Sequence, residues 1–119
     1  MAKEELRKKV DLAFLSAFYG GLLTDKQRQV LSLHCEEDLS LGEIAEEVGI
    51  SRQAVHETIT RAAARLTEME NSLGMAARFR RMESGLEEAL SALKQQDYYR
   101  AEDLLTGLLA LDQEDTDGL

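Results

Sequence analysis

One short segment, residues 40–60, restricts the fold of this chain more than any other. Ser40 and Glu43 match the capping box that begins a helix, and Gly49 can adopt the left-handed conformation that ends one. Ser51 is then a favourable N-cap for a second helix. Apolar or small residues stand where two short crossing helices need them, at Leu41, Ile44, Ala45, Val48, Ile50, Val55 and Ile59. The segment therefore predicts a helix-turn-helix.

The composition of the whole chain favours helix over strand. The 119 residues include no proline and 8 glycines, and Ala, Leu, Glu, Arg and Gln dominate. These abundant residue types have high or adequate helix propensity. We therefore expect an all-α protein, and a chain of this length has room for one main core.

Two helices are expected before the helix-turn-helix segment. The first should cover residues 3–19 and end at Gly20 and Gly21, and the second should begin after Thr24, which can form a capping box with Gln27. Helical spacing predicts the buried face of the first helix as Leu6, Val10, Ala13, Phe14 and Ala17. The apolar residues of the second are Val30, Leu31, Leu33 and Cys35.

The helix that begins after Ser51 is longer than a three-helix core requires. Its apolar residues follow the spacing of a coiled-coil seam, at Val55, Ile59, Ala62, Leu66, Met69 and Leu73. At 1.5 Å per residue, a helix from Ser51 to Leu73 would be about 34 Å long. Its distal part therefore needs a further element to cover it.

After Gly74 the apolar pattern restarts in a new register, which indicates a turn or kink. The new seam consists of Met75, Phe79, Met82, Leu86, Ala89 and Leu93. A last helix, with Asp97 as N-cap, should end near Leu111. We predict a helix-turn-helix domain over residues 1–73, a helical hairpin over 74–111 and an acidic, disordered tail over 112–119. The two exposed seams also favour a homodimer, although packing within the chain could cover them instead.

The outward face of the long recognition helix carries the candidate binding residues. Arg52 and Gln53 suit the edges of guanine and adenine, and Ser51 stands where backbone N–H groups can meet a phosphate. The complete candidate set is Lys26, Arg28, Ser51, Arg52, Gln53, His56, Thr60, Arg61 and Arg65. Double-stranded DNA is one partner for this face. The alternative is an ordinary solvated helix face, because the preceding helix carries three glutamates, Glu43, Glu46 and Glu47.

Other classes of function are disfavoured by the sequence. A net charge of −9 argues against indiscriminate coating of nucleic acid or anionic membrane. We expect no enzyme activity, since the chain has no glycine-rich phosphate loop and no Gly-x-Ser-x-Gly or His-Glu-x-x-His motif. We expect no cofactor, and no metal site, because a single cysteine, Cys35, cannot complete a zinc site with His34 and His56.

The apolar runs are too short for a membrane span. The charged N-terminus also does not look like a signal peptide, so we expect a cytoplasmic protein.

Three stretches resemble the bacterial YlxM family: FYGGLLTDKQR at 18–28, DLSLGEIAEE at 38–47 and SRQAV at 51–55. The resemblance covers about residues 12–73. It implies a helical domain like the region 4 domain that sigma factors use to bind DNA. It also implies a non-enzymatic regulatory or accessory role in the signal recognition particle pathway, with the particle's GTPase or RNA as partner. The alternative that the residues leave open is a sequence-specific DNA-binding transcriptional regulator.

Overall fold

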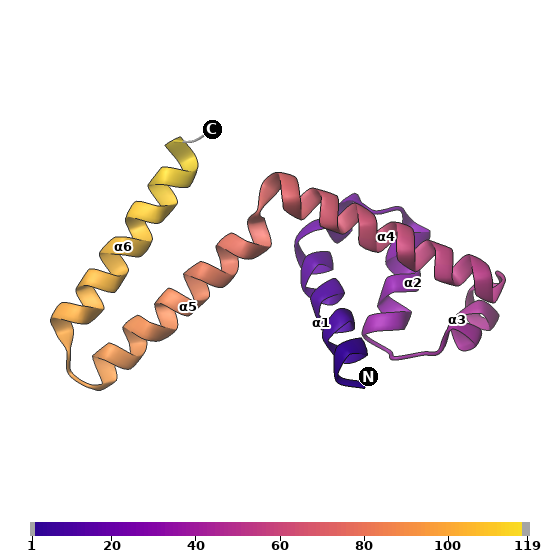
Figure 1. The fold of residues 1–119 in the computed structure, drawn as a ribbon, viewed down its shortest axis with the longest axis horizontal. Coiled ribbons are helices and arrows are strands. Elements are labelled where there is room, and N and C mark those ends of the chain that lie inside the picture. Colours follow the sequence, from indigo (N-terminus) through magenta and orange to yellow (C-terminus); the bar gives the residue numbers. More distant parts are fainter. Residues whose placement is uncertain (1, 118–119) are drawn as a thin grey trace. The chain divides into compact units, whose positions relative to one another are not determined.

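The structure, a computed structural model, describes the backbone of residues 2–117 and the side chains of residues 2–111. The described part contains α1 (Ala2–Tyr19), η1 (Gly20–Leu22), α2 (Asp25–Cys35), α3 (Leu41–Val48), α4 (Arg52–Leu73), α5 (Met75–Lys94) and α6 (Tyr98–Asp117) (Figure 1). It contains no strand over residues 2–117, which confirms the all-α prediction. The chain divides into two compact units, Met1–Ala76 and Ala77–Leu119. The predicted division into a helix-turn-helix domain over 1–73, a hairpin over 74–111 and a tail stays a prediction.

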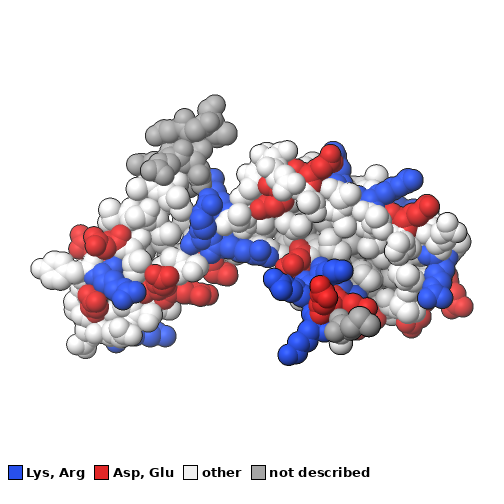
Figure 2. Space-filling view, in the orientation of Figure 1, with Lys and Arg blue, Asp and Glu red and all other residues white. Residues whose placement is uncertain are grey.

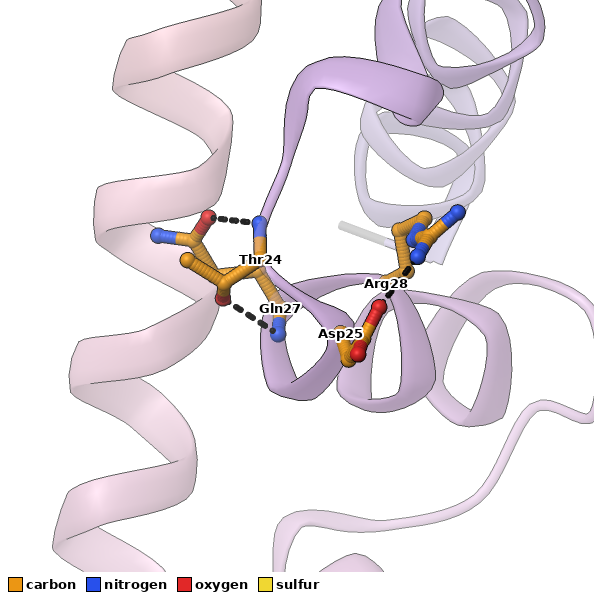
Figure 3. A network of polar contacts seen from close by, with 4 residues as sticks. All are labelled: Thr24, Asp25, Gln27 and Arg28. Atoms are coloured by element: carbon orange, nitrogen blue, oxygen red, sulfur yellow. Dashed lines mark hydrogen bonds and ion pairs between the residues drawn. The ribbon is translucent and has the colours of Figure 1, made fainter.

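Both predicted capping boxes are present in the first unit. The Thr24 hydroxyl accepts a hydrogen bond from the Gln27 backbone N–H at 3.1 Å, and the Gln27 side chain accepts one from the Thr24 N–H at 3.0 Å (Figure 3). Ser40 and Glu43 form the same pair of bonds at the start of α3, at 3.1 and 3.0 Å. Each box satisfies backbone donors that have no partner inside the helix, which explains where α2 and α3 begin.

The chain turns sharply between α3 and α4. Gly49 ends α3 with a φ of 79°, a left-handed conformation that favours glycine. The Ala45 carbonyl accepts hydrogen bonds from the N–H groups of Gly49 at 2.9 Å and Ile50 at 3.2 Å. The Ser51 hydroxyl then caps α4 by accepting from the Ala54 N–H at 3.0 Å. This break confirms the helix-turn-helix.

Two apolar clusters hold the first unit together and meet at Ile59. Val30, Ile44 and Val55 are fully buried between α2, α3 and the start of α4. Further along α4, Ala62, Leu66 and Met69 pack with residues of α1 and α2. The predicted seam of α4 is therefore covered within the chain from Val55 to Met69, and α1 is the element that covers its distal part. A dimer is not needed to bury that seam.

The predicted buried face of α1 is wrong. Leu6 and Val10 are 64% and 57% exposed, Ala17 is exposed, and Ala13 and Phe14 are only partly buried. The residues of α1 that pack on the core are instead Leu12, Leu15, Phe18 and Tyr19. The difference arises because α1 contributes to the core only from Leu12 onward, and because the arc that faces α2 and α4 is centred on Leu15 and Tyr19.

In the second unit, α6 runs back beside α5 as a hairpin (Figure 1). Small residues lie at the contact: Ala89, Ala92 and Ala101 are buried, and a Cβ on Gly85 would lie only 2.5 Å from Leu108 Cδ2. Asp97 accepts a hydrogen bond from the Arg100 N–H at 3.2 Å, as an N-cap does. Helix α6 continues to Asp117 rather than ending near Leu111, and the predicted disorder of the tail 112–119 stays a prediction, since its side chains lie outside the described residues.

Candidate nucleic-acid or partner interface

The first turns of α4 present most of the predicted site residues to solvent. Arg52, Gln53, His56, Thr60 and Arg61 are all exposed. On the other side of the same turns, Val55 and Ala62 are fully buried in the core. Burial of one side of α4 therefore fixes which residues a ligand can reach, and the helix-turn-helix presents them as a single face.

The charge of this face is mixed. Among residues 2–111, Arg52 and Arg61 make no ion pair, whereas Arg65 lies 3.9 Å from Glu68. Glu57 is exposed and stands four residues from both Gln53 and Arg61, so it interrupts the row of polar side chains. A polyanion would meet two unpaired arginines at most in this row.

Helix α3, which packs against α4, adds exposed carboxylates at Glu43, Glu46 and Glu47. Figure 2 shows basic and acidic side chains intermixed over the visible face of the Met1–Ala76 unit. The surface formed by α3 and α4 therefore lacks the dense cationic cluster that drives non-specific binding of nucleic acid. Recognition through α4 would depend on the placement of a few side chains.

Lys26 and Arg28 occupy a different position from the α4 residues. Both are exposed on the first turns of α2, and the Arg28 guanidinium donates to the Asp25 carboxylate, three residues earlier. Arg28 points away from Thr24 and Gln27 (Figure 3) and lines a groove between α1 and α2, together with Leu12, Ser16 and Cys35. Arg28 therefore belongs to the α1–α2 groove.

Two hydroxyl groups of the candidate set have local roles. The Ser51 oxygen accepts the capping bond from Ala54, which leaves its proton available for donation to a ligand. Thr60 donates its proton to the His56 carbonyl at 2.9 Å, so its hydroxyl can only accept from a ligand.

The sequence reasoning missed an ion pair beside the helix-turn-helix. Lys9 of α1 donates to the carboxylate of Asp38, in the loop that precedes α3. This hydrogen bond and the positive charge hold the pKa of Asp38 below its ordinary value. Asp38 also has a φ of 54°, which is uncommon outside glycine. The two partners are 29 positions apart in the chain, which explains why no local pattern revealed the pair.

Cys35 and His34 lie close to this ion pair. Burial raises the pKa of the Cys35 thiol, which opposes formation of a reactive thiolate. Burial, followed by the charge of Lys9, lowers the pKa of His34. Within the part of the chain whose side chains are described, no group of three or more His, Cys, Asp or Glu residues could hold a metal ion. No helix within the described residues is long and apolar enough to cross a lipid bilayer.

Comparison with known proteins gives one consistent result. Residues 6–105 match a family model described as "Putative helix-turn-helix protein, YlxM / p13 like", the UPF0122 family. A UPF0122 protein of Halalkalibacterium halodurans is 41% identical over 107 residues, which cover 90% of this chain and 96% of the relative. One from Symbiobacterium thermophilum is 43% identical over 99 residues, covering 83% and 92%.

A third relative, from Desulforamulus reducens, is 44% identical over 79 residues, 66% of this chain and 68% of the relative. The matched region includes the capping boxes, the Gly49 turn and the exposed face of α4, and it extends through most of the C-terminal hairpin. The chain belongs to the UPF0122 family of YlxM/p13-like helix-turn-helix proteins.

Proposed function

We propose that this protein is a non-enzymatic regulatory protein of the signal recognition particle pathway, and that it acts in the cytoplasm. The family resemblance supplies the pathway. The observation that carries the proposal is the exposed face of α4, where Arg52 and Gln53 follow directly after a three-residue turn and Arg61 lies further along the helix. In a helix-turn-helix this second helix is the element presented to a ligand.

The face suits a partner that is recognised at a few points. Arg52 and Arg61 have no ion-pair partner among the described residues, so their guanidinium groups can bind phosphate or carboxylate without first breaking an intramolecular bond. The particle's RNA offers phosphates, and its GTPase offers carboxylates. Both fit this chemistry, and both are partners implied by the family.

A direct binding experiment tests this proposal. The purified chain is titrated against fluorescently labelled signal recognition particle RNA, and separately against the particle's GTPase with hydrolysis of GTP as a second readout. We expect micromolar or tighter binding to one of them, and a loss of roughly tenfold or more for the double variant Arg52→Ala/Arg61→Ala. Arg7→Ala, an exposed arginine of α1, is the matched control and should bind like the wild type. If neither component binds and GTP hydrolysis is unchanged, the proposal fails.

The second candidate is a sequence-specific DNA-binding transcriptional regulator. One observation favours it: Arg52 and Gln53 are adjacent, exposed and in the first turn of α4, where helix-turn-helix proteins read base edges in the major groove. Lys26 and Arg65 would add phosphate contacts. The position of Arg28 in the α1–α2 groove, paired with Asp25, weakens its part in this interface.

Selection from a random double-stranded DNA library tests the second candidate. We expect one enriched motif at low salt, binding that weakens steeply as salt rises, and a loss of about 1–3 kcal/mol for Arg52→Ala at the base it reads. An Arg65→Ala change should weaken all sequences equally. Absence of any enriched motif, or an Arg52→Ala variant with an unchanged DNA sequence preference, would reject the DNA-binding candidate. Neither outcome would affect the result of the RNA and GTPase experiment.

A further inference from the structure

Helix α5 has its large apolar side chains on the outside and its small ones against α6. Gly85, Ala89 and Ala92 form the side that faces α6, where Gly85 meets Leu108. Leu86, Leu90 and Leu93 remain 52%, 53% and 44% exposed. Globular helices normally bury the larger residues, since burial stabilises roughly in proportion to apolar area. The exposed side of α5 therefore has the character of a contact surface.

A groove runs along this exposed side of α5. Its lining is Phe79, Met82, Glu83, Leu86, Glu87 and Leu90. The only polar groups in this lining are the two carboxylates along its edge. A partner should thus bring apolar side chains to the groove and positive charges to that edge.

The sequence of α5 is complementary to itself when two copies of the helix are aligned antiparallel. Residues at nearly equal distances on either side of position 84 pair apolar with apolar, Met82 with Leu86 and Phe79 with Leu90, and all four line the groove. The reversal also brings Arg80 within one position of Glu87, which stands seven residues further along and therefore lies on the same side of α5. Two antiparallel α5 helices would therefore align both their apolar seams and their opposite charges.

We propose that two copies of this chain associate through α5, antiparallel and related by a two-fold axis near residue 84. Leu86 of each copy packs on Met82 of the other, and Arg80, which lies two helical turns before Glu87 on the same side of α5, meets Glu87 of the other copy. A two-fold axis makes each contact occur twice, as in most protein dimers. This surface lies wholly on the hairpin, so the association is independent of what α4 binds.

The first test measures the association of the full chain. Sedimentation velocity over a range of concentrations should show a concentration-dependent monomer–dimer equilibrium. Leu86→Glu should raise the dissociation constant at least about a hundredfold, because it buries a charge at the centre of the seam. Leu109→Glu is the matched control, since Leu109 is 68% exposed on α6 and lies outside the groove. A wild-type chain that stays monomeric into the millimolar range, or equal effects of the two variants, would overturn the proposal.

The second test fixes the antiparallel register. Arg80→Glu and Glu87→Arg should each weaken the dimer by roughly tenfold, because each places like charges together across the interface. An equimolar mixture of these two variants should recover wild-type affinity, since every cross-interface pair then joins one Glu to one Arg. No rearrangement within a single chain can produce that recovery. A mixture whose dimer affinity is no higher than that of the separate variants would reject this register. Affinity that is recovered only when an unrelated basic helix is added would reject it as well.

Discussion

The Tyr19 hydroxyl donates a hydrogen bond of 2.6 Å to Glu70 Oε1, which joins the end of α1 to the last turns of α4. The same two atoms accept the first donors of α5: the Met75 N–H reaches the Tyr19 oxygen at 2.9 Å, and the Ala76 N–H reaches Glu70 at 3.0 Å. Burial, and then the bond to Glu70, raise the pKa of Tyr19 above its ordinary value of 10.0. The phenol therefore stays protonated and keeps its donor at neutral pH.

Replacing Tyr19 by Phe should destabilise the protein by about 1–3 kcal/mol, because the Met75 N–H loses its acceptor beside a buried ring. Urea unfolding followed by circular dichroism measures the loss, and amide hydrogen exchange should show faster exchange at Met75. Tyr98→Phe removes a hydroxyl from a ring that is 63% exposed and serves as the control. Equal stability of the two variants would contradict the capping role of Tyr19.

Gly49→Ala and Gly42→Ala should have opposite effects on stability. Gly49 has a φ of 79°, where a Cβ costs about 1–2 kcal/mol. Gly42 lies inside α3, and a Cβ there would be 4.0 Å from the Ser40 Oγ, an ordinary contact. Alanine at position 42 should therefore stabilise α3 by about 0.5–1 kcal/mol. The midpoints of urea unfolding give both values, and a destabilising Gly42→Ala would show that the turn is not the reason for the difference.

Local patterns predicted the helix starts and the turn because the atoms involved are close in the chain. The two capping boxes each span three residues, and the Gly49 turn is set by its own backbone conformation. The seam of α4 was also predictable, since helical period fixes one face whatever packs on it. The exposure of Arg52, Gln53 and Arg61 follows from the same period.

Features that join distant segments were not predictable from the sequence. The Tyr19–Glu70 bond spans 51 residues and the Lys9–Asp38 pair spans 29, and no spacing rule links such positions. The buried face of α1 depends on which helices pack against it. The periodicity of α1 alone therefore predicted the wrong face. The position of Arg28 was different, because Asp25 three residues earlier was a readable signal for a helical ion pair.

Glu43 should contribute to the acid sensitivity of the helix-turn-helix. Hydrogen bonds from the Ser40 N–H, and then from its hydroxyl, lower the pKa of Glu43 below its ordinary value of 4.5. The unfolded chain therefore binds this proton first as pH falls, so the stabilisation is complete above the unfolded pKa and is lost as pH falls through the folded one. Glu43→Gln should unfold with a weaker dependence on pH below about 5. Urea unfolding at several pH values measures this slope, and a Glu43→Gln variant with the same slope as the wild type would contradict the prediction.

Gly85 and Leu108 should be energetically coupled across the α5–α6 hairpin. A Cβ at position 85 would lie 2.5 Å from Leu108 Cδ2 and 3.0 Å from its Cγ, so alanine must displace the leucine. In the wild type this overpacking opposes the gain of about 1 kcal/mol that alanine brings to a helix. In a Leu108→Ala background the contact is gone, and Gly85→Ala should show the full gain. A double-mutant cycle by urea unfolding should give a coupling energy of about 0.5–3 kcal/mol. A coupling near zero would mean that the small side of α5 does not set the spacing of the hairpin.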